Sequence, residues 1–529
     1  MQASTNPPQL VLMIVTDQTR ADHLGFGGLA LGHTPHLDSI AERGTQFDRA
    51  YATNPVCMPS RATLATGRWP SAHGTRTNGI PLDQSAETVM TALRREGWMT
   101  HAVGKLHFQT MGWPFTPEQQ AQIEATSPDD IDDRLREAVR HTGTDTDWEL
   151  LVRHRSERID LPADYYGLET VDLIVGHGDR CSGNYHHWAA DHGIDLAALG
   201  GHANSRRASP RWTEVWESSV PAPFSTSAFV AERAGEAIMR AGASQQPTFL
   251  FVSFPDPHHP FCPPAEYSTR FSPSDMAAPA SFGAQHHNLP PHIQQILDRP
   301  GQPHVDPTFL FAPSIEQYRE AMAAQLGLIA MVDDAVGRII GAVDAAGLAD
   351  DTVTIVTSDH GDLMGDHGLM LKHYSHYDAV TRVPLVFSGD GISSQQTSAL
   401  VSNADVAPTI LDLTGVNRHI GVQGRSLRGI LEQTANEARA AVLIEEDQPI
   451  SVDGLPAPLQ IRTVITEQGR LTRYTSKIAE VYDHLDDPLE LTNLVDEPEG
   501  AALKAALTDQ LVDEMAAAAH TGRRIVHSA

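Results

Sequence analysis

The sequence predicts an α/β fold in which helices cover both faces of a mixed, largely parallel β-sheet. Short and nearly continuous apolar runs are typical of strands that are buried on both faces. Helical segments separate them, most clearly at 88–97 and 318–347. Alternating strands and helices predict parallel strands joined by helical crossovers. The five expected strands lie at 10–16, 100–104, 249–254, 352–358 and 384–387.

The pattern changes after about residue 430. The runs AVLIEE, LQIRTVIT and GRLTRYTS read as strands joined by short links, with a turn at 467–469 between the second and third. An alanine-rich helix at about 499–519 follows. We therefore expect a large α/β domain over 1–430 and a smaller α+β domain, with an antiparallel sheet and a helix, over 431–529. The segment 285–315 is rich in Pro and His and is expected to be an irregular surface loop.

Composition excludes several classes of partner. The chain has 529 residues and a formal net charge of −29, which argues against nucleic acid and anionic membranes as partners. The charge also disfavours long polyanionic substrates, unless the site carries a local positive patch. The three cysteines, Cys57, Cys181 and Cys262, are too few and odd in number, which argues against a disulfide framework. No secretory signal or transmembrane run is seen, so we expect a cytoplasmic protein.

Polar residues follow four of the predicted strands. In open parallel sheets, ligands bind outside the carboxyl ends of the strands. Four such ends can therefore converge on one crevice. The residues are Asp17 and Gln18, Lys105 and His107, His258 and His259, and Asp359 and His360.

Two of these strand ends supply a donor set for a metal ion. Asp17, Gln18, Asp359 and His360 offer oxygen and imidazole ligands, which suit calcium, manganese or magnesium better than a thiolate-binding metal. A single aspartate at such a position is more often a helix cap or a turn former. Because two such pairs follow two strands, metal binding becomes the favoured interpretation.

Cys57 lies in a polar and basic context. Pro59 favours the first position of a helix, so Cys57 is expected to face a helix N-terminus, where the dipole and free N–H groups attract anions. Arg61 and Arg68 add guanidinium groups suited to oxyanions. A lone cysteine is usually a small buried apolar residue. The polar and basic surroundings of Cys57 instead favour a functional cysteine.

The segment CMPSR (57–61), followed by TGR (66–68), resembles the signature of the type I, formylglycine-dependent sulfatases of the alkaline phosphatase superfamily. In that family a separate enzyme oxidises the cysteine to formylglycine. Other segments resemble family segments in the expected order and span roughly 10–494. They are VTDQ (15–18), GWMTHAVGKLH (97–107), PDPHHPF (255–261), TSDHGD (357–362), GLMLKHYSHYD (368–378) and VYDHLDDPLELTNL (481–494).

The resemblance implies an alkaline-phosphatase-like fold and a sulfatase that hydrolyses sulfate monoesters. It implies that Asp17, Gln18, Asp359 and His360 hold one divalent ion, with modified Cys57 as a further ligand. Arg61 would position the aldehyde hydrate. The sulfate group would be surrounded by Lys105, His107, His258 and Lys372. One hydroxyl of the hydrate would attack sulfur, His258 or Lys372 would protonate the leaving oxygen, and His107 would take the proton of the second hydroxyl.

The implied cofactors are one Ca²⁺ or Mn²⁺ ion and the formylglycine made from Cys57. The implied partners are a small-molecule sulfate ester and a formylglycine-generating or other maturation enzyme. Homo-oligomerisation stays open. Many family members have two adjacent aspartates where this chain has Asp17 and Gln18, and Asn is common where His360 stands. Fewer negative ligands and an imidazole favour manganese or another transition metal over strict calcium use.

Two alternatives stay open. Phosphonate monoester and phosphodiester hydrolases of the same superfamily also resemble the Asp-Gln and Asp-His pattern, although they generally lack the segment GK-x-H found at 104–107. A non-catalytic metal-binding homologue would keep Cys57 unmodified. Metal binding alone does not need the five further polar residues of the predicted site, which argues against it. The histidines between His177 and His192 are equally compatible with a substrate entrance and with a solvated loop.

Overall fold

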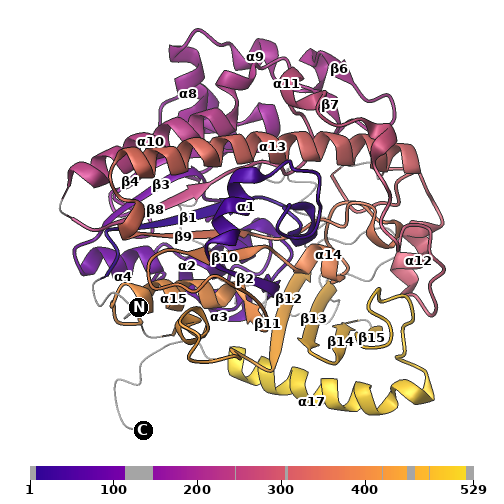
Figure 1. The fold of residues 1–529 in the computed structure, drawn as a ribbon. Helices are drawn as coiled ribbons and strands as arrows, with labels where there is room; N and C mark the ends of the chain where they lie inside the picture. Colours follow the sequence, from indigo (N-terminus) through magenta and orange to yellow (C-terminus); the bar gives the residue numbers. More distant parts are fainter. Residues whose placement is uncertain are drawn as a thin grey trace, which may run out of the picture.

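The computed structural model describes residues 7–112, 147–244, 246–303, 308–419, 421–448, 459–475 and 477–519. Its main feature is a nine-stranded mixed sheet, which confirms the expected α/β class (Figure 1). From one edge to the other, the strands are β11 (Gln395–Ser402), β2 (Thr45–Tyr51), β10 (Leu385–Ser388), β9 (Thr352–Ser358), β1 (Leu10–Thr16), β8 (Thr248–Ser253), β3 (Met99–Lys105), β4 (Thr170–Val175) and β5 (Ser182–Gly183).

The central strands are parallel, as expected from their apolar sequences. β1 pairs in parallel with both β8 and β9, and β3 pairs in parallel with β8 and β4. β10 is antiparallel to both of its neighbours, β9 and β2. The carboxyl ends of β9, β1, β8, β3 and β4 therefore lie along one edge of the sheet.

Helices cover both faces of the sheet because successive side chains of a strand point to opposite sides. Leu10, Leu12 and Ile14 of β1 pack with α1 (Pro35–Glu42), α10 (Thr226–Ala243) and α13 (Ile315–Ala345). Val11 and Met13 pack on the other face, with α2 (Cys57–Thr66), α4 (Val89–Arg95) and α15 (Val406–Leu413). Figure 1 shows α10 and α13 on one side of the sheet and α2, α4 and α15 on the other.

The C-terminal part forms the expected small antiparallel sheet with one helix. Its strands are β12 (Ala441–Gln448), β13 (Leu459–Thr466), β14 (Gly469–Tyr474) and β15 (Ala479–Asp483), in that order. The fourth strand was not expected from the sequence. α17 (Ala501–Ala518) covers one face of this sheet through Leu507 and Leu511 (Figure 1). A domain boundary at residue 430 stays a prediction, and it falls within the short helix α16 (Arg428–Leu431).

The segment 285–315 differs in part from the expected irregular loop. Proline at the first helical position supports a two-turn helix, α12 (Pro291–Leu297), whose Ile293 is fully buried. Residues 304–307 lie outside the described part. The remaining short elements are α3 (Pro70–His73), α7 (Leu151–Ser156), α8 (Asn184–Asp191), α9 (Leu196–Leu199), β6 (Arg207–Ala208), β7 (Trp216–Glu217), α11 (Ala265–Ser268) and α14 (Asp378–Thr381).

Candidate active site

Two neighbouring strand ends bring the predicted metal ligands together. The backbone N–H of Asp359, after β9, donates to the carbonyl of Thr16 at the end of β1, at 3.2 Å. The backbone N–H of Gln18 in turn donates to the Asp359 carboxylate at 3.1 Å. Gln18 takes a positive φ of 64°, which turns the chain sharply as it leaves the strand. Parallel pairing of β1 and β9 therefore places Asp17 and Gln18 next to Asp359 and His360.

Cys57 is the first residue of α2, so the helix begins two residues earlier than the sequence suggested. Val56 is the N-cap, so Pro59 occupies the third helical position. Every residue of α2 is buried, and the Cys57 side chain lies against ionisable groups. Its Sγ lies 3.2 Å from Nε2 of His360, 3.3 Å from Nζ of Lys372 and 3.8 Å from an oxygen of Asp17. The helix N-terminus thus faces the site, as expected.

A buried Asp–Cys–His group of the kind that holds a metal ion lies at this point. The ligand atoms of Asp17, Cys57, Asp359 and His360 all lie within 4.8 Å of one another, and all four residues are buried. Acceptors also exceed donors around them, because Lys372 has three protons but four acceptors within 3.3 Å. Carboxylate and imidazole ligands with more lone pairs than nearby hydrogen-bond donors can satisfy fit a divalent cation.

Gln18 presents its amide oxygen to the same group. Its Nε2 donates to the buried carboxylate of Asp362 and to Nδ1 of His259, the latter at 3.2 Å. A carboxylate can only accept, so these contacts fix the amide with its oxygen on the other side. That oxygen accepts from Lys372 at 2.9 Å. His259, which the sequence placed after a predicted strand without a role, and Asp362, which lies in the segment TSDHGD, are therefore supporting residues of Gln18.

Arg61 joins the two carboxylates to the sheet. Its Nε donates to Asp359 at 2.7 Å, and one terminal nitrogen lies 3.5 Å from Asp17. Its Nη1 donates to the carbonyl of Lys105 at 2.8 Å and to the hydroxyl of Ser253 at 2.7 Å. All these groups are buried. The planar fork of a guanidinium suits such divided contacts, which a lysine could not reproduce.

The two lysines lie on either side of this group. Lys372 contacts Gln18, Cys57, His360 and Nε2 of His258, the last at 2.8 Å. Lys105 contacts Asp17 and lies 2.7 Å from Nε2 of His177. Both ammonium groups are buried in an otherwise acidic protein. They form the local positive patch that the net charge made necessary.

Histidines line the remaining side. His177 and His258 stack with ring centroids 3.8 Å apart, and the His107 ring lies edge-on to His177 at 6.4 Å. Nδ1 of His107 is buried without a hydrogen-bond partner in the described structure. His177 follows β4 and is only partly buried, with 26% of its side chain exposed. The sequence left two interpretations open for the histidines from His177 to His192, a substrate entrance and a solvated loop. Partial exposure beside the buried site favours the substrate entrance for His177. His186 and His187 lie on α8.

The electrostatic environment favours neutral imidazoles and an ionised Asp17. Burial, together with Lys105 and Arg61, lowers the pKa of His107 well below its usual value. Burial, His177 and Lys372 do the same to the pKa of His258, and burial lowers the pKa of His360 to about 4. Burial alone would raise the pKa of Asp17, but Lys105, Arg61 and Lys372 outweigh it and hold that pKa well below its usual range. Neutral imidazoles can bind metal or accept protons at neutral pH.

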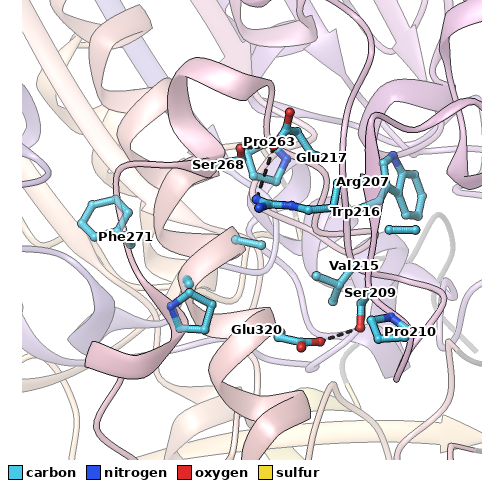
Figure 2. Close-up of a pocket in the computed structure, with 14 residues that line it drawn as sticks. Arg207, Ser209, Pro210, Val215, Trp216, Glu217, Pro263, Ser268, Phe271 and Glu320 are labelled. Atoms are coloured by element: carbon cyan, nitrogen blue, oxygen red, sulfur yellow. Dashed lines mark hydrogen bonds and ion pairs between the residues drawn. The ribbon is translucent and has the colours of Figure 1, made fainter.

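A separate surface cavity of about 280 Å³ lies between the β6–β7 hairpin, α11 and α13 (Figure 2). Arg207 and Glu217 pair across one side of it at 3.3 Å, and Ser209 contacts Glu320 on another. None of the predicted catalytic or metal-binding residues is among the described residues that line it. This cavity is therefore separate from the polar residues gathered at the carboxyl edge of the main sheet.

Within the described ranges, no helix combines the length and the apolar character that crossing a membrane requires.

Comparison with known proteins agrees with this arrangement. The choline-sulfatase of Rhizobium meliloti (strain 1021) is 25% identical over 502 residues, covering 94% of this chain and 84% of the relative. The multifunctional alkaline phosphatase superfamily protein PehA of Trinickia caryophylli is 28% identical over 527 residues, with 93% and 92% covered.

Solved structures show the same architecture. The phosphonate monoester hydrolase of Silicibacter pomeroyi superposes with a TM-score of 0.75 at 26% identity, covering 98% of this chain and 96% of that one. The phosphonate monoester hydrolase of Agrobacterium radiobacter gives 0.73 at 25%, covering 97% and 96%. These neighbours confirm the alkaline-phosphatase-like fold.

Two family models match the sequence itself. The model described as "N-sulphoglucosamine sulphohydrolase, C-terminal" matches residues 365–517. The model described as "Sulfatase" matches residues 9–416, which is most of the chain. With CMPSR at the buried helix start and the Asp–Cys–His group beside it, this chain belongs to the sulfatase family, within the alkaline phosphatase superfamily.

Proposed function

We propose that this chain hydrolyses sulfate monoesters to an alcohol and inorganic sulfate. The observation that carries the proposal is the convergence of Lys105, His107, His258 and Lys372 on the side of Cys57. These groups are not needed to hold a metal, and they suit the binding of a tetrahedral anion and the movement of its protons. Similarity to a choline-sulfatase over most of the chain supports the same reading.

Two groups complete the site. We propose that Asp17, Gln18, Asp359 and His360 hold one divalent ion, Mn²⁺ or Ca²⁺, with residue 57 as a further ligand. When bound, such an ion withdraws charge from the ester oxygens and favours attack on sulfur. Formylglycine made from Cys57 by a maturation enzyme supplies, as its hydrate, two hydroxyls on one carbon. Arg61 positions residue 57 by holding Asp17 and Asp359 next to it.

The lysines bind the sulfate group. A sulfate monoester is an anion, and a nucleophile must approach it against its charge. Lys105 and Lys372 are buried ammonium groups on either side of residue 57, and preorganised charge of this kind acts strongly where water is excluded. Their contacts with Asp17 and Gln18 keep them in place before substrate arrives.

Two histidines divide the proton transfers. Lys372 donates to neutral His258 at 2.8 Å, so this pair holds a proton that can pass to the leaving alcohol oxygen. His107 is neutral, and its Nδ1 is free to accept. We assign it the removal of the proton from the second hydroxyl, which expels sulfate and restores the aldehyde.

Phosphonate monoester hydrolysis is the second candidate. The Asp17-Gln18 and Asp359-His360 pairs and the two phosphonate monoester hydrolase neighbours favour it. Sulfate monoesters and phosphonate monoesters both carry one negative charge at neutral pH, so gross charge does not separate them. Lys105 and His107 favour sulfate, and we propose phosphonate hydrolysis as a side activity.

The experiment that tests this function is incubation of His107→Ala with an aryl sulfate. We expect the first attack to proceed and sulfate to stay on the protein, seen as a gain of one sulfuryl group on the peptide 50–61. His187→Ala is the matched control, because His187 lies on α8 and its ring bonds the Glu157 carbonyl. Normal turnover by His107→Ala would contradict the assignment.

A further inference from the structure

Glu149 is a buried carboxylate that none of the roles above uses. It lies just before α7, and none of its surface is exposed. Within the described structure no lysine or arginine forms an ion pair with it. A buried carboxylate without a cation is costly unless hydrogen bonds replace water. The groups that donate hydrogen bonds to Glu149 therefore indicate its role.

The partners of Glu149 are the backbone N–H groups of the segment that carries His107. Its Oε2 accepts from His107 N at 2.6 Å, and its Oε1 accepts from Phe108 N and Gln109 N, both at 3.1 Å. The hydroxyl of Tyr165 donates a fourth bond at 2.9 Å. The side-chain oxygen of Gln109 in turn accepts from Trp148 N at 3.0 Å, so each of the two segments donates a hydrogen bond to the other.

These bonds hold a strained turn. His107 has a positive φ of 57°, a conformation that is unfavourable for a residue with a β-carbon and persists only where the surroundings impose it. The turn directly follows Lys105, the last residue of β3. It leaves the His107 ring beside His177 with Nδ1 unpartnered. The carboxylate binds the backbone of His107 and leaves its imidazole free.

We propose that Glu149 is the positioning residue for His107: its buried carboxylate fixes the backbone turn that presents the imidazole to the reaction. The inference rests on the function proposed above, in which His107 removes a proton. Glu149 itself touches no reacting atom. It acts by keeping three N–H groups in one arrangement.

The protonation of Glu149 gives this role a pH signature. Burial raises its pKa to about 7, against the opposing bonds from Tyr165 and the three backbone N–H groups. The titratable groups that face it are the hydroxyls of Tyr165 and Tyr166, whose pKa values are themselves raised by burial, and His107. Only the ionised form has two free acceptor oxygens for four donors. The turn is therefore best held above about pH 7.

The test compares Glu149→Gln with wild type and with Glu157→Gln, which makes the same chemical change at an exposed carboxylate paired with Arg153. Hydrogen–deuterium exchange of a peptide covering 106–110 reports the turn without any need for activity. Because bonds to a charged group are lost, exchange in Glu149→Gln should be at least about tenfold faster. On the preferred ester, kcat should fall about 10–100-fold through misplacement of His107, with little change in KM.

The pH profile separates positioning from mere structural support. In wild type, kcat should fall as pH drops through about 7, and in Glu149→Gln this limb should be lost. Faster exchange with unchanged kcat and an unchanged pH profile would overturn the proposal, as would unchanged exchange. If Glu149→Gln does not fold, Glu149→Asp keeps the charge on a side chain too short to reach all three N–H groups, so faster exchange and a lower kcat are expected, and unchanged values of both would overturn the proposal. If wild type prefers a phosphonate ester, the sulfate assignment fails, and the comparison on that ester still decides the role of Glu149.

Discussion

The ammonium group of Lys372 lies 3.3 Å from the Sγ of Cys57, although 315 residues separate them in the chain. Lys372 also lies within hydrogen-bond distance of His258, His360 and Gln18. Leu371, His373 and Tyr374 around it all have positive φ, so the backbone there is held in an unfavourable form by its surroundings. One lysine thus contacts Cys57, His360 and His258, to which we assign the nucleophile position, a metal ligand and a share in proton donation.

Replacement of Lys372 by Met should lower kcat/KM by about 10²–10³, because one preorganised charge near the reacting group is lost. Metal content should be kept, since the carboxylates and His360 stay in place. Lys504→Met is the control, because Lys504 lies on α17 and bonds the Val495 carbonyl. A loss in kcat/KM of less than about threefold would exclude Lys372 from sulfate binding.

Cys57 should be converted to formylglycine when the protein is made together with a maturation enzyme. The conversion follows from the CMPSR segment and the position of Cys57 at the buried start of α2. Mass spectrometry of the tryptic peptide 50–61 measures it directly. Active enzyme that carries only the thiol would eliminate the proposed nucleophile.

One divalent ion per chain should bind, and Asp359→Ala should remove most of the metal and most of the activity. Asp359 supplies one of two carboxylates in the buried Asp–Cys–His group. Elemental analysis and activity, each measured beside the exposed Asp350→Ala as control, check this. A stoichiometry of two ions per chain would instead favour a dinuclear, phosphatase-like site.

Arg61→Ala should destabilise the fold by about 3–5 kcal/mol, because it removes the cation paired with buried Asp359 and one of the two cations paired with buried Asp17. Arg61→Lys should recover little of this, since one ammonium cannot span Asp359, Ser253 and the Lys105 carbonyl. Urea unfolding measures the difference. The exposed pair Arg95–Glu87 provides the control, as Arg95→Ala should cost only about 0–1 kcal/mol. Equal effects of the two alanine variants would refute the structural role of Arg61.

Stability should depend on pH through Glu149. Its pKa rises from about 4.5 unfolded to about 7 folded, so the folded state binds more protons between these values. Its contribution to the free energy of unfolding is full below about pH 4.5 and is lost as pH rises through about 7, because burial of the ionised carboxylate costs more than its four hydrogen bonds return, although this form holds the turn best. Burial also raises the pKa of Asp256 and of Asp333 to about 6, but both carboxyls are present in wild type and variant alike. The Tm difference between wild type and Glu149→Gln should therefore change across this window, and a constant difference would contradict the raised pKa.

The central strands and the residues after them could be predicted because both depend on local pattern. The apolar runs of β1, β8 and β9 match their observed bounds to within one residue. β2 (TQFDRAY) and β11 (QQTSALVS) were missed because neither contains the long apolar run that marked the central strands, and several of their side chains are only partly buried. Their burial is decided by neighbours that are distant in sequence.

The same limit explains what was missed in the site. β4 (TVDLIV) was not counted as a strand, so His177 had no strand end to follow and remained one of several histidines. Glu149 precedes α7 without a motif, and only its contacts with His107, Phe108 and Gln109 give it a role. Asp362 lay within a family-like segment, but its bond to Gln18 depends on the packing of β1 beside β9. Motif residues can be read from sequence, whereas the residues that support them need the fold.

The central claim is that a sulfate monoester is the main substrate. The most direct measurement is kcat/KM of metal-loaded, formylglycine-containing enzyme on an aryl sulfate, an alkyl sulfate, a phosphonate monoester and a phosphodiester, side by side. The arrangement of Lys105 and His107 around His177, next to Asp17, predicts the highest value for one of the two sulfates. A phosphonate monoester preferred by a large factor over both sulfates would contradict the account.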